Sequence, residues 1–294
     1  MASPDILIEQ QTDEPVTGVE LPVVTLQPFS AEATYPVQTL FGCPIAKLRM
    51  AEAVDEVYRL IACRGTTCRY VVTPNVDHVV MLQEHRGLRR AYRDAALVVA
   101  DGMPVVLASR LLGKPLPERI TGTDLLIAAL EAASQRGGLR VYLLGALPGV
   151  AVQAAGKIHE RWPAVQVVGT NSPPFGFEHD PEYVANLLED IRQCQPDLLV
   201  VGLGAPKQEL FVHAHRQEID ALAMCVGAAI DFIAGNKQRA PAWMQRWGLE
   251  WLHRVATEPR RLLRRYLRDA WRFPPLVWRD WRNKRKQRDG LQPS

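Results

Sequence analysis

The length and composition of the chain set limits on what it can be. Its 294 residues suffice for one large α/β domain with appendages, and a hydrophobic content of 47% is ordinary for a globular protein. The longest apolar run, from Ala221 to Ala234, contains Asp231 and falls short of the ~20 residues that a membrane span needs. The N-terminus has no basic region followed by an apolar one, so neither a signal peptide nor a membrane span is expected.

Charge is distributed unevenly, although the formal net charge is only +3. Residues 1–46 contain six acidic residues and no Lys or Arg, whereas the segment from Arg254 onward contains 13 Lys or Arg against four acidic residues. The C-terminal end is therefore expected to meet an anionic partner. The five cysteines are odd in number and form no Cys-x-x-Cys pair, which favours free thiols in a reducing cytosol.

The first half of the chain predicts a disordered tail followed by helices and strands. Residues 1–36 are acidic, contain prolines and show no hydrophobic period, as expected of a disordered tail. Apolar residues at helical spacing predict a helix from Cys43 to Cys63. The elements expected next are a strand over 70–73, a helix over 76–93, a strand ending before Asp101, and helices over 104–112 and 124–135.

From residue 140 onward, strands and helices alternate regularly. Strands are expected over 140–144, 165–169, 197–201 and 222–226, with helices over 150–162, 181–193 and 207–219 between them. This alternation predicts βαβ units, and hence a Rossmann-like, mainly parallel sheet with helices on both faces. We assign residues 37–240 to this α/β core.

Two of the predicted strands are rich in β-branched residues and end in polar ones, at Thr73-Pro74-Asn75 and at Asp101-Gly102. The carboxyl ends of parallel strands meet at one edge of the sheet, where ligands bind in a crevice. A carboxylate at that edge is partly desolvated, so its pKa rises toward the working pH and it can act as a general base. Alternatively, Asp101 is only an Asx-turn residue that ends a strand.

Three motifs carry a family resemblance: Thr73-Pro74-Asn75, the stretch Ala-Asp-Gly-Met-Pro-Val-Val at 100–106, and Glu-Arg-Ile-Thr-Gly-Thr-Asp at 118–124. They resemble the WecG/TagA/CpsF glycosyltransferases of bacterial surface polysaccharide synthesis, over about residues 40–270. The resemblance implies an inverting transferase that moves a sugar from a UDP-sugar to a polyprenyl-pyrophosphate-linked glycan. We expect Asp101 to be the base, and Thr73 and Asn75 to position the sugar or orient the carboxylate, unless they merely form a turn. The resemblance leaves the sugar itself open.

Two glycine-bearing loops, 145–149 and 202–209, each follow a strand and open a helix. Such loops can turn backbone N–H groups toward a phosphate, but tight connections also need glycine for steric reasons alone. In the family, the second loop corresponds to the stretch whose glutamine, here Gln208, contributes to the nucleotide-sugar pocket, and Gly145 and Gly204 are expected beside it. Neither loop has the complete Gly-x-Gly-x-x-Gly pattern, which weakens the alternative of a nicotinamide-dependent oxidoreductase.

The motif at 118–124 supplies further candidates for substrate binding. Arg119 could clamp a diphosphate with paired hydrogen bonds, or form a structural ion pair with Glu118 or Asp124. Gly122 and Asp124 belong to the same expected site, although Asp124 could serve only to complement a helix dipole. No Asp-x-Asp sequence occurs, so no metal or other cofactor is expected, and the charge of a leaving diphosphate would be met by Arg, Lys and backbone amides.

The C-terminal segment, residues 241–294, mixes aromatic and basic residues. Trp243, Trp247 and Trp251 recur every four residues and stripe one face of an expected helix. Aromatic and basic side chains together suit a helix at an anionic membrane surface. A helix packed on the core with a solvated basic tail, or a segment that binds RNA, would show the same mixture.

The family resemblance favours lipid for this segment. Arg254, Arg261 and Arg264, which share one face of a continuing helix that Pro259 could kink, match the family pattern Trp-Leu-x-Arg … Glu-Pro-x-Arg-x-x-Arg in a membrane-directed appendage. Arg239 falls in a second family motif, Ala-Gly-x-x-x-Arg-Ala-Pro, just before that appendage. These arginines would complete the site over the acceptor.

These inferences predict a cytoplasmic enzyme that is peripheral on the inner face of the cell membrane and does not bind nucleic acid. A non-enzymatic protein that binds RNA or an acidic partner through the basic tail is the second alternative. Homo-oligomerisation is left open, as are the role of the N-terminal tail and a disordered state of residues 281–288.

Overall fold

The computed structural model describes residues 35–289 except 64–66, 242, 245–249 and 258. The predicted disordered tail, apart from residues 35 and 36, lies outside the described residues, as does Trp247. The side chain of Arg261 also lies outside the described part, although its backbone belongs to a helix.

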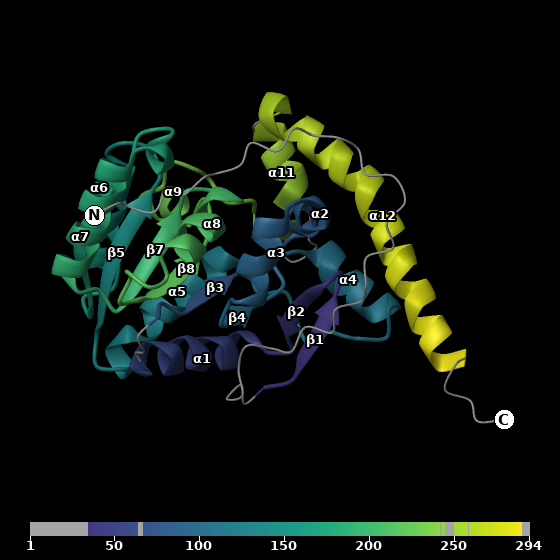
Figure 1. Cartoon of the computed structure of the whole chain (residues 1–294). Coiled ribbons are helices and arrows are strands. Elements are labelled where there is room, and N and C mark those ends of the chain that lie inside the picture. The colour runs from purple at the N-terminus through teal and green to yellow at the C-terminus, as the bar shows by residue number, and fades with distance from the viewer. Residues whose placement is uncertain (1–34, 64–66, 242, 245–249, 258, 290–294) are drawn as a thin grey trace, which may run out of the picture.

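A six-stranded sheet forms the centre of the molecule (Figure 1). Its strands lie in the order β4-β3-β8-β7-β5-β6, and each of the five neighbouring pairs is parallel. The strands are β3 (Tyr70–Val72), β4 (Leu97–Val98), β5 (Leu139–Gly145), β6 (Val165–Asn171), β7 (Leu198–Gly202) and β8 (Leu222–Cys225). The expected mainly parallel sheet is thereby confirmed.

Helices cover both faces of this sheet because successive side chains of a strand point to opposite faces. In β7, Leu199 and Val201 pack into one buried apolar cluster, and Leu198 and Val200 pack into the other. The first cluster is completed by α2 (Val76–Glu84), α3 (Arg86–Arg93), α4 (Met103–Leu111), α7 (Pro181–Cys194) and α8 (Lys207–Ala214). The second is completed by α1 (Met50–Ala62), α5 (Gly122–Ala132), α6 (Val150–Arg161) and α9 (Ala229–Ala234).

The helix predicted to begin at Cys43 is wrong in its first seven residues, about two helical turns. A two-stranded antiparallel hairpin, β1 (Val37–Leu40) and β2 (Cys43–Ala46), occupies that part of the chain. Pro44 cannot donate a helical hydrogen bond, and the hairpin turns at Phe41 and Gly42, whose φ angles are 56° and 77°. Helix α1 starts only after Arg49, whose backbone N–H donates to Glu52 Oε2 at 2.7 Å.

Two other helices are shorter than predicted. The helix expected over 76–93 is broken at His85, because the Nδ1 atom of His85 accepts a hydrogen bond from the backbone N–H of Leu88 at 3.1 Å and caps a new helix there. The helix expected over 207–219 ends at Ala214, where the chain turns toward β8.

Where the structure describes the C-terminal segment from Glu250 onward, the chain is divided between two helices, in place of the single continuing helix that was predicted. They are α11 (Glu250–Thr257) and α12 (Pro259–Asp289), and α12 begins at Pro259, a residue suited to a first helical turn. Helix α12 continues to Asp289 and so includes residues 281–288. In the described part of the chain, none of the helices combines the length and the apolar character that crossing a membrane requires.

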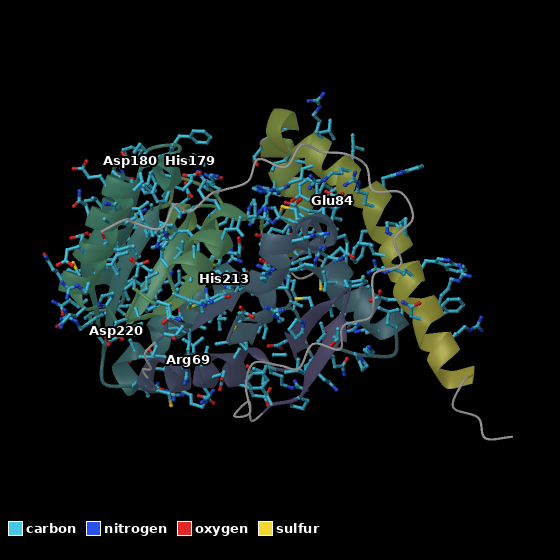
Figure 2. All side chains as sticks on the ribbon, in the orientation of Figure 1. Arg69, Glu84, His179, Asp180, His213 and Asp220 are labelled. Atoms are coloured by element: carbon cyan, nitrogen blue, oxygen red, sulfur yellow. The ribbon has the colours of Figure 1, made fainter. Side chains whose placement is uncertain are left out.

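Helix α12 lies along α2 and passes the hairpin (Figure 1). The rings of Phe273 and Phe41 lie 5.3 Å apart, and Asp280 Oδ2 accepts a hydrogen bond from the backbone N–H of Phe41 at 2.8 Å. Arg268 pairs with Asp77 of α2, and Arg272 pairs with Glu84, which is labelled in Figure 2. These contacts fix α12 against the helix whose first residues follow the end of β3.

The parallel strands place all their carboxyl ends at one edge of the sheet. Figure 2 shows the two edges: Arg69 and Asp220, which precede β3 and β8, lie at the lower edge, and His179 and Asp180, which follow β6, lie at the upper edge. The loops that carry most of the expected site residues therefore share the upper edge.

At that edge, β5 and β7 approach so closely that Gly145 has a steric role. Its φ angle is +119°, and a Cβ atom added there would lie 2.6 Å from the carbonyl carbon and oxygen of Gly202. Gly149, four residues later, also has a positive φ angle of +83°, but a Cβ atom on it would meet nothing within 4 Å.

We predict that Gly145→Ala destabilises the protein by about 3 kcal/mol or more, because both backbone strain and an atomic clash must be relieved. The matched variant Gly149→Ala should cost only about 1–2 kcal/mol, the strain of a left-handed residue. Chemical denaturation of the two variants measures the difference. Equal losses in both would mean that the β5–β7 contact does not require glycine.

Candidate active site

Asp101 lies just beyond the carboxyl end of β4, beside the segment that follows β3. Its backbone N–H donates to the carbonyl oxygen of Pro74 at 2.9 Å, and the carbonyl oxygen of Ala100 accepts from Ile120 at 2.9 Å. Three chain segments, those at 73–75, 100–102 and 119–124, are thereby held together at the sheet edge. The Asp101 side chain keeps partial access to solvent in this position.

The environment of Asp101 combines dense packing with charges of both signs. Burial is the main influence and raises the pKa of Asp101 to about 6, above the usual value of a carboxyl group. The positive charge of Arg254 opposes this rise, the negative charge of Glu250 adds to it, and Arg119 and His78 oppose it. A carboxylate with a pKa near 6 is both largely ionised and appreciably basic at neutral pH, as a general base requires.

Arg119 pairs with neither of the partners considered from the sequence. Its Nη1 lies 3.4 Å from Glu250 Oε2, and the other oxygen of Glu250 lies 3.5 Å from Arg254 Nη2. Glu118 instead accepts a hydrogen bond from the backbone N–H of Met50. Arg254 is also stacked over the ring of Phe232 in α9, with its guanidinium carbon 5.4 Å from the ring centroid. Helix α11 thus brings an arginine and a carboxylate to the core.

Asp124 is the partner of Arg239. Its Oδ1 lies 2.6 Å from Arg239 Nη1, and its Oδ2 accepts a hydrogen bond from the hydroxyl of Thr121 at 2.7 Å. Burial alone would raise the pKa of Asp124, but these hydrogen bonds outweigh it and hold the pKa below its usual value. Nε and Nη2 of Arg239 are buried and have no partner among the described residues, so this guanidinium has donors to spare.

Thr73, Asn75 and Gly122 hold the edge together. Thr73 is buried, and a Cβ atom added to Gly122 would lie 2.9 Å from its hydroxyl oxygen and 3.3 Å from the Cα atom of Val226. Asn75 caps α2: its side chain accepts from the backbone N–H of His78 at 3.3 Å, and its own N–H donates to His78 Nδ1 at 3.2 Å. The side-chain oxygen of Asn75 is therefore already used by the helix.

Gln208 connects two loops at the same edge. Its Oε1 accepts hydrogen bonds from the backbone N–H groups of Gly204, at 3.3 Å, and Gly227, at 3.1 Å. Its Nε2 donates to Glu209 Oε1 at 2.8 Å, and the side chain is only 2% exposed. The side-chain oxygen of Gln208 is thus engaged by the backbone of the loops after β7 and β8. Because Val226 touches Gly122, these loops continue the edge that carries Thr73 and Asp101.

Arg264 is exposed on α12, and it is not among the charged groups that act most strongly on Asp101. The candidate site therefore unites Asp101 with Arg119, Arg239 and Arg254. Within the described residues, no group of three His, Cys, Asp or Glu side chains is arranged to hold a metal ion.

The sequence of this chain is similar to those of known proteins. The model of the Glycosyl transferase WecG/TagA/CpsF family matches residues 38–287. The chain belongs to this family. Two relatives are named N-acetylglucosaminyldiphosphoundecaprenol N-acetyl-beta-D-mannosaminyltransferase. The one from Bacillus spizizenii is 32% identical over 193 residues, which cover 65% of this chain and 72% of the relative. The one from Staphylococcus aureus is 28% identical over 228 residues, which cover 76% and 85% of the two chains.

Sequence reasoning missed two residues that act on Asp101 at the candidate site, Glu250 and His78. Glu250 opens α11 directly before Trp251, and only the chain's path places it against Arg119, 131 positions earlier. His78 follows Asn75 by three residues, a spacing that could have indicated a paired cap on α2.

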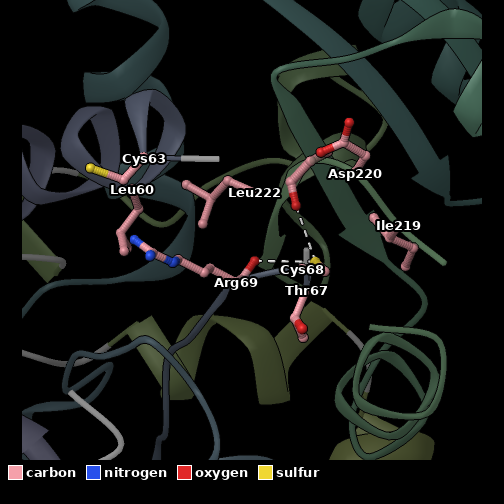
Figure 3. Close-up of a pocket in the computed structure, with 9 residues that line it drawn as sticks. Leu60, Cys63, Thr67, Cys68, Arg69, Ile219, Asp220 and Leu222 are labelled. Atoms are coloured by element: carbon pink, nitrogen blue, oxygen red, sulfur yellow. Dashed lines mark hydrogen bonds between the residues drawn. The ribbon is translucent and has the colours of Figure 1, made fainter. Parts of the chain in front are cut away.

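A small hollow lies at the opposite edge of the sheet, and Figure 3 shows its lining. Cys68 donates hydrogen bonds there to the carbonyl oxygens of Ala221, at 3.1 Å, and Arg69, at 3.2 Å. Burial raises the pKa of Cys68 to about 12, so its thiol is protonated at neutral pH. The hollow lies among residues that precede β3 and β8, away from the site of Asp101.

We predict that Gln208→Leu removes the acceptor shared by the amides of Gly204 and Gly227 and destabilises the protein by about 1–3 kcal/mol. Thermal unfolding measures the loss, and hydrogen exchange should show both amides losing protection. The control is Gln193→Leu, because Gln193 donates to Glu189 at 2.7 Å on the exposed surface of α7 and should change stability by less than about 0.5 kcal/mol. Unchanged protection of both glycine amides would contradict this role.

Proposed function

We propose that this family member is an inverting glycosyltransferase that moves a sugar from a UDP-sugar to a sugar linked through a diphosphate to a polyprenyl lipid. The observation that carries the proposal is the Asp101 carboxylate, which has a raised pKa and lies among arginines at the carboxyl edge of a parallel sheet. The names of the two relatives, which describe transfer to a diphosphoundecaprenol-linked sugar, support the class of acceptor. The resemblance of the motifs supports the UDP-sugar donor.

The reaction would proceed in one displacement. The oxygen of an acceptor hydroxyl attacks the anomeric carbon of the donor sugar, and its proton passes to the Asp101 carboxylate. The bond between the anomeric carbon and the diphosphate breaks, and UDP leaves with the bonding electron pair. Attack opposite the leaving group inverts the configuration at that carbon.

Three arginines are proposed to stabilise the charge of the leaving diphosphate. Arg119 and Arg254 both lie close enough to Asp101 to influence its pKa, and Arg239 has two buried nitrogens, Nε and Nη2, without partners in the described part of the chain. Guanidinium groups bind phosphate oxygens through paired hydrogen bonds and stay charged at any working pH. We propose that they serve this purpose without a metal ion, in a chain that has no Asp-x-Asp motif.

We also propose that α11 and α12 form an appendage that rests on an anionic membrane surface, with the protein on the cytoplasmic side. The outer side chains of these helices include Trp251, Leu267, Trp271 and Trp278, with exposed fractions of 43%, 61%, 83% and 57%. Arginines lie between them along α12. Tryptophan rings at headgroup depth together with cations on lipid phosphates suit a helix lying in a membrane interface. Such a position would bring the lipid-linked acceptor to Asp101.

We predict that Asp101→Asn retains at most about one-hundredth of the transfer rate, because general-base catalysis usually contributes roughly 10²–10⁴ in rate. UDP binding, measured by calorimetry, should persist because the arginines are intact. Asp55→Asn is the control, since Asp55 lies on α1 with a side chain that is 63% exposed. A turnover close to that of the native enzyme would remove Asp101 from the role of base.

The assignment of Asp101 as the base also determines how kcat/KM should depend on pH. Asp101 accepts a proton only when ionised, so kcat/KM should be level above its pKa of about 6 and fall about tenfold for each pH unit below it. This acidic limb should be absent from the residual activity of Asp101→Asn.

We predict that the double substitution Leu267→Ala and Trp271→Ala weakens flotation of the protein with liposomes of anionic phospholipid by about tenfold or more, because both side chains would be inserted at the interface. Val152→Ala on α6, where the side chain is 62% exposed, is the matched control and should leave flotation unchanged. Equal flotation of the double variant and the native protein would rule out this face of α12 as the membrane contact.

A further inference from the structure

We propose that Glu250 is a positioning residue that holds Arg119 and Arg254 in place while the donor site is empty and yields both arginines to the donor diphosphate. This inference rests on the proposed function, because it concerns the same arginines and the same base. Helix α11 would then supply both Arg254 and the carboxylate that holds the two arginines in place.

The geometry places one carboxylate between two guanidinium groups from different parts of the molecule. Glu250 Oε2 faces Arg119 Nη1 at 3.4 Å, and Oε1 faces Arg254 Nη2 at 3.5 Å. Arg119 belongs to the core segment before α5, whereas Arg254 lies four residues after Glu250 on α11. The side chains of Glu250 and Arg119 are only 13% and 15% exposed, so solvent screens their attraction weakly. Glu250 therefore ties the appendage to the core at the candidate site.

These contacts are long enough to be exchanged. Distances of 3.4 and 3.5 Å lie beyond the usual range of an N–H···O hydrogen bond, whereas Arg239 and Asp124 meet at 2.6 Å. Diphosphate oxygens form charge-assisted bonds with guanidinium groups at about 2.7–2.9 Å. A bound diphosphate would thus offer Arg119 and Arg254 better acceptors than Glu250 does. It also carries several negative charges, whereas Glu250 carries one.

Glu250 also acts on the base. The groups that face Asp101 are Arg254 and Glu250 from α11, Arg119 from the segment before α5, His78 from α2, Tyr92 from α3 and Arg239 from the segment after α9. Among those that act most on it, Glu250 is the one whose charge favours the protonated form. The arginine charges lower the pKa of Asp101. A bound diphosphate would neutralise those charges, so the pKa of Asp101 would stay raised while the donor is bound.

The test compares UDP binding and the pH profile of Glu250→Gln with those of the native full-length protein. Glutamine keeps the shape of the side chain and removes its charge. We expect UDP to bind roughly threefold to tenfold more tightly, since a like charge beside the diphosphate is lost. We expect the acidic limb of kcat/KM to move down by roughly half a pH unit, since the charge that raises the pKa of Asp101 is gone. A less basic Asp101 should also lower kcat.

The matched control is Glu131→Gln, because Glu131 pairs with Arg161 at 3.3 Å on the surface of α5, where the Glu131 side chain is 51% exposed. It should change neither UDP affinity nor the pH profile. Tighter binding together with a lower kcat separates a positioning role from a merely structural one, which would weaken both.

Unchanged or weaker UDP binding by Glu250→Gln, with an unmoved acidic limb, would overturn the proposal. Should that variant fail to fold, Glu250→Ala must show the same gain in UDP affinity, and a loss would likewise overturn it. Failure of the native protein itself to bind UDP would instead contradict the proposed function.

Discussion

Partial desolvation of one carboxylate, that of Asp101, is the constraint on which the rest of the site depends. A carboxylate in open water is too weak a base to take a proton from a hydroxyl efficiently, and a fully buried one cannot reach a substrate. The sheet resolves this conflict by placing Asp101 just past the end of a two-residue strand, where its backbone is anchored to Pro74 and its side chain stays partly exposed. The surrounding arginines then keep the charged form accessible at neutral pH.

The C-terminal helices complete this electrostatic environment. Without α11, Asp101 would lack both the cation and the anion that act on it most strongly after burial, Arg254 and Glu250. Helix α12 in turn is fixed to α2 by Asp77, two residues beyond Asn75 at the site. The appendage therefore contacts the core close to the candidate site, and the charges that α11 brings there bear directly on the pKa of Asp101.

Much of this could be predicted from the sequence because periodic patterns report local structure. Alternating strands and helices indicated the parallel sheet, and strand ends located Thr73 and Asp101 at one edge. Contacts between distant segments have no such pattern in the sequence. Nothing in the sequence indicates that Arg119 pairs with Glu250 or Asp124 with Arg239. The hairpin at β1 and β2 was missed because the helical spacing of the apolar residues that follow it was extended back to Cys43, across Pro44 and just past the turn at Phe41 and Gly42.

The structure also separates two kinds of residue that the motifs present together. Gly145 is explained by the close approach of β5 and β7, and both ends of the Gln208 amide are occupied by the protein itself. The presence of Gly145 and of Gln208 is therefore explained without any contact with a ligand. Arg239, in contrast, keeps buried N–H donors that no described residue satisfies, which is costly unless a ligand supplies the acceptors. The unsatisfied donors of Arg239 therefore support our proposal that arginines, rather than the glycine loops, bind the donor diphosphate.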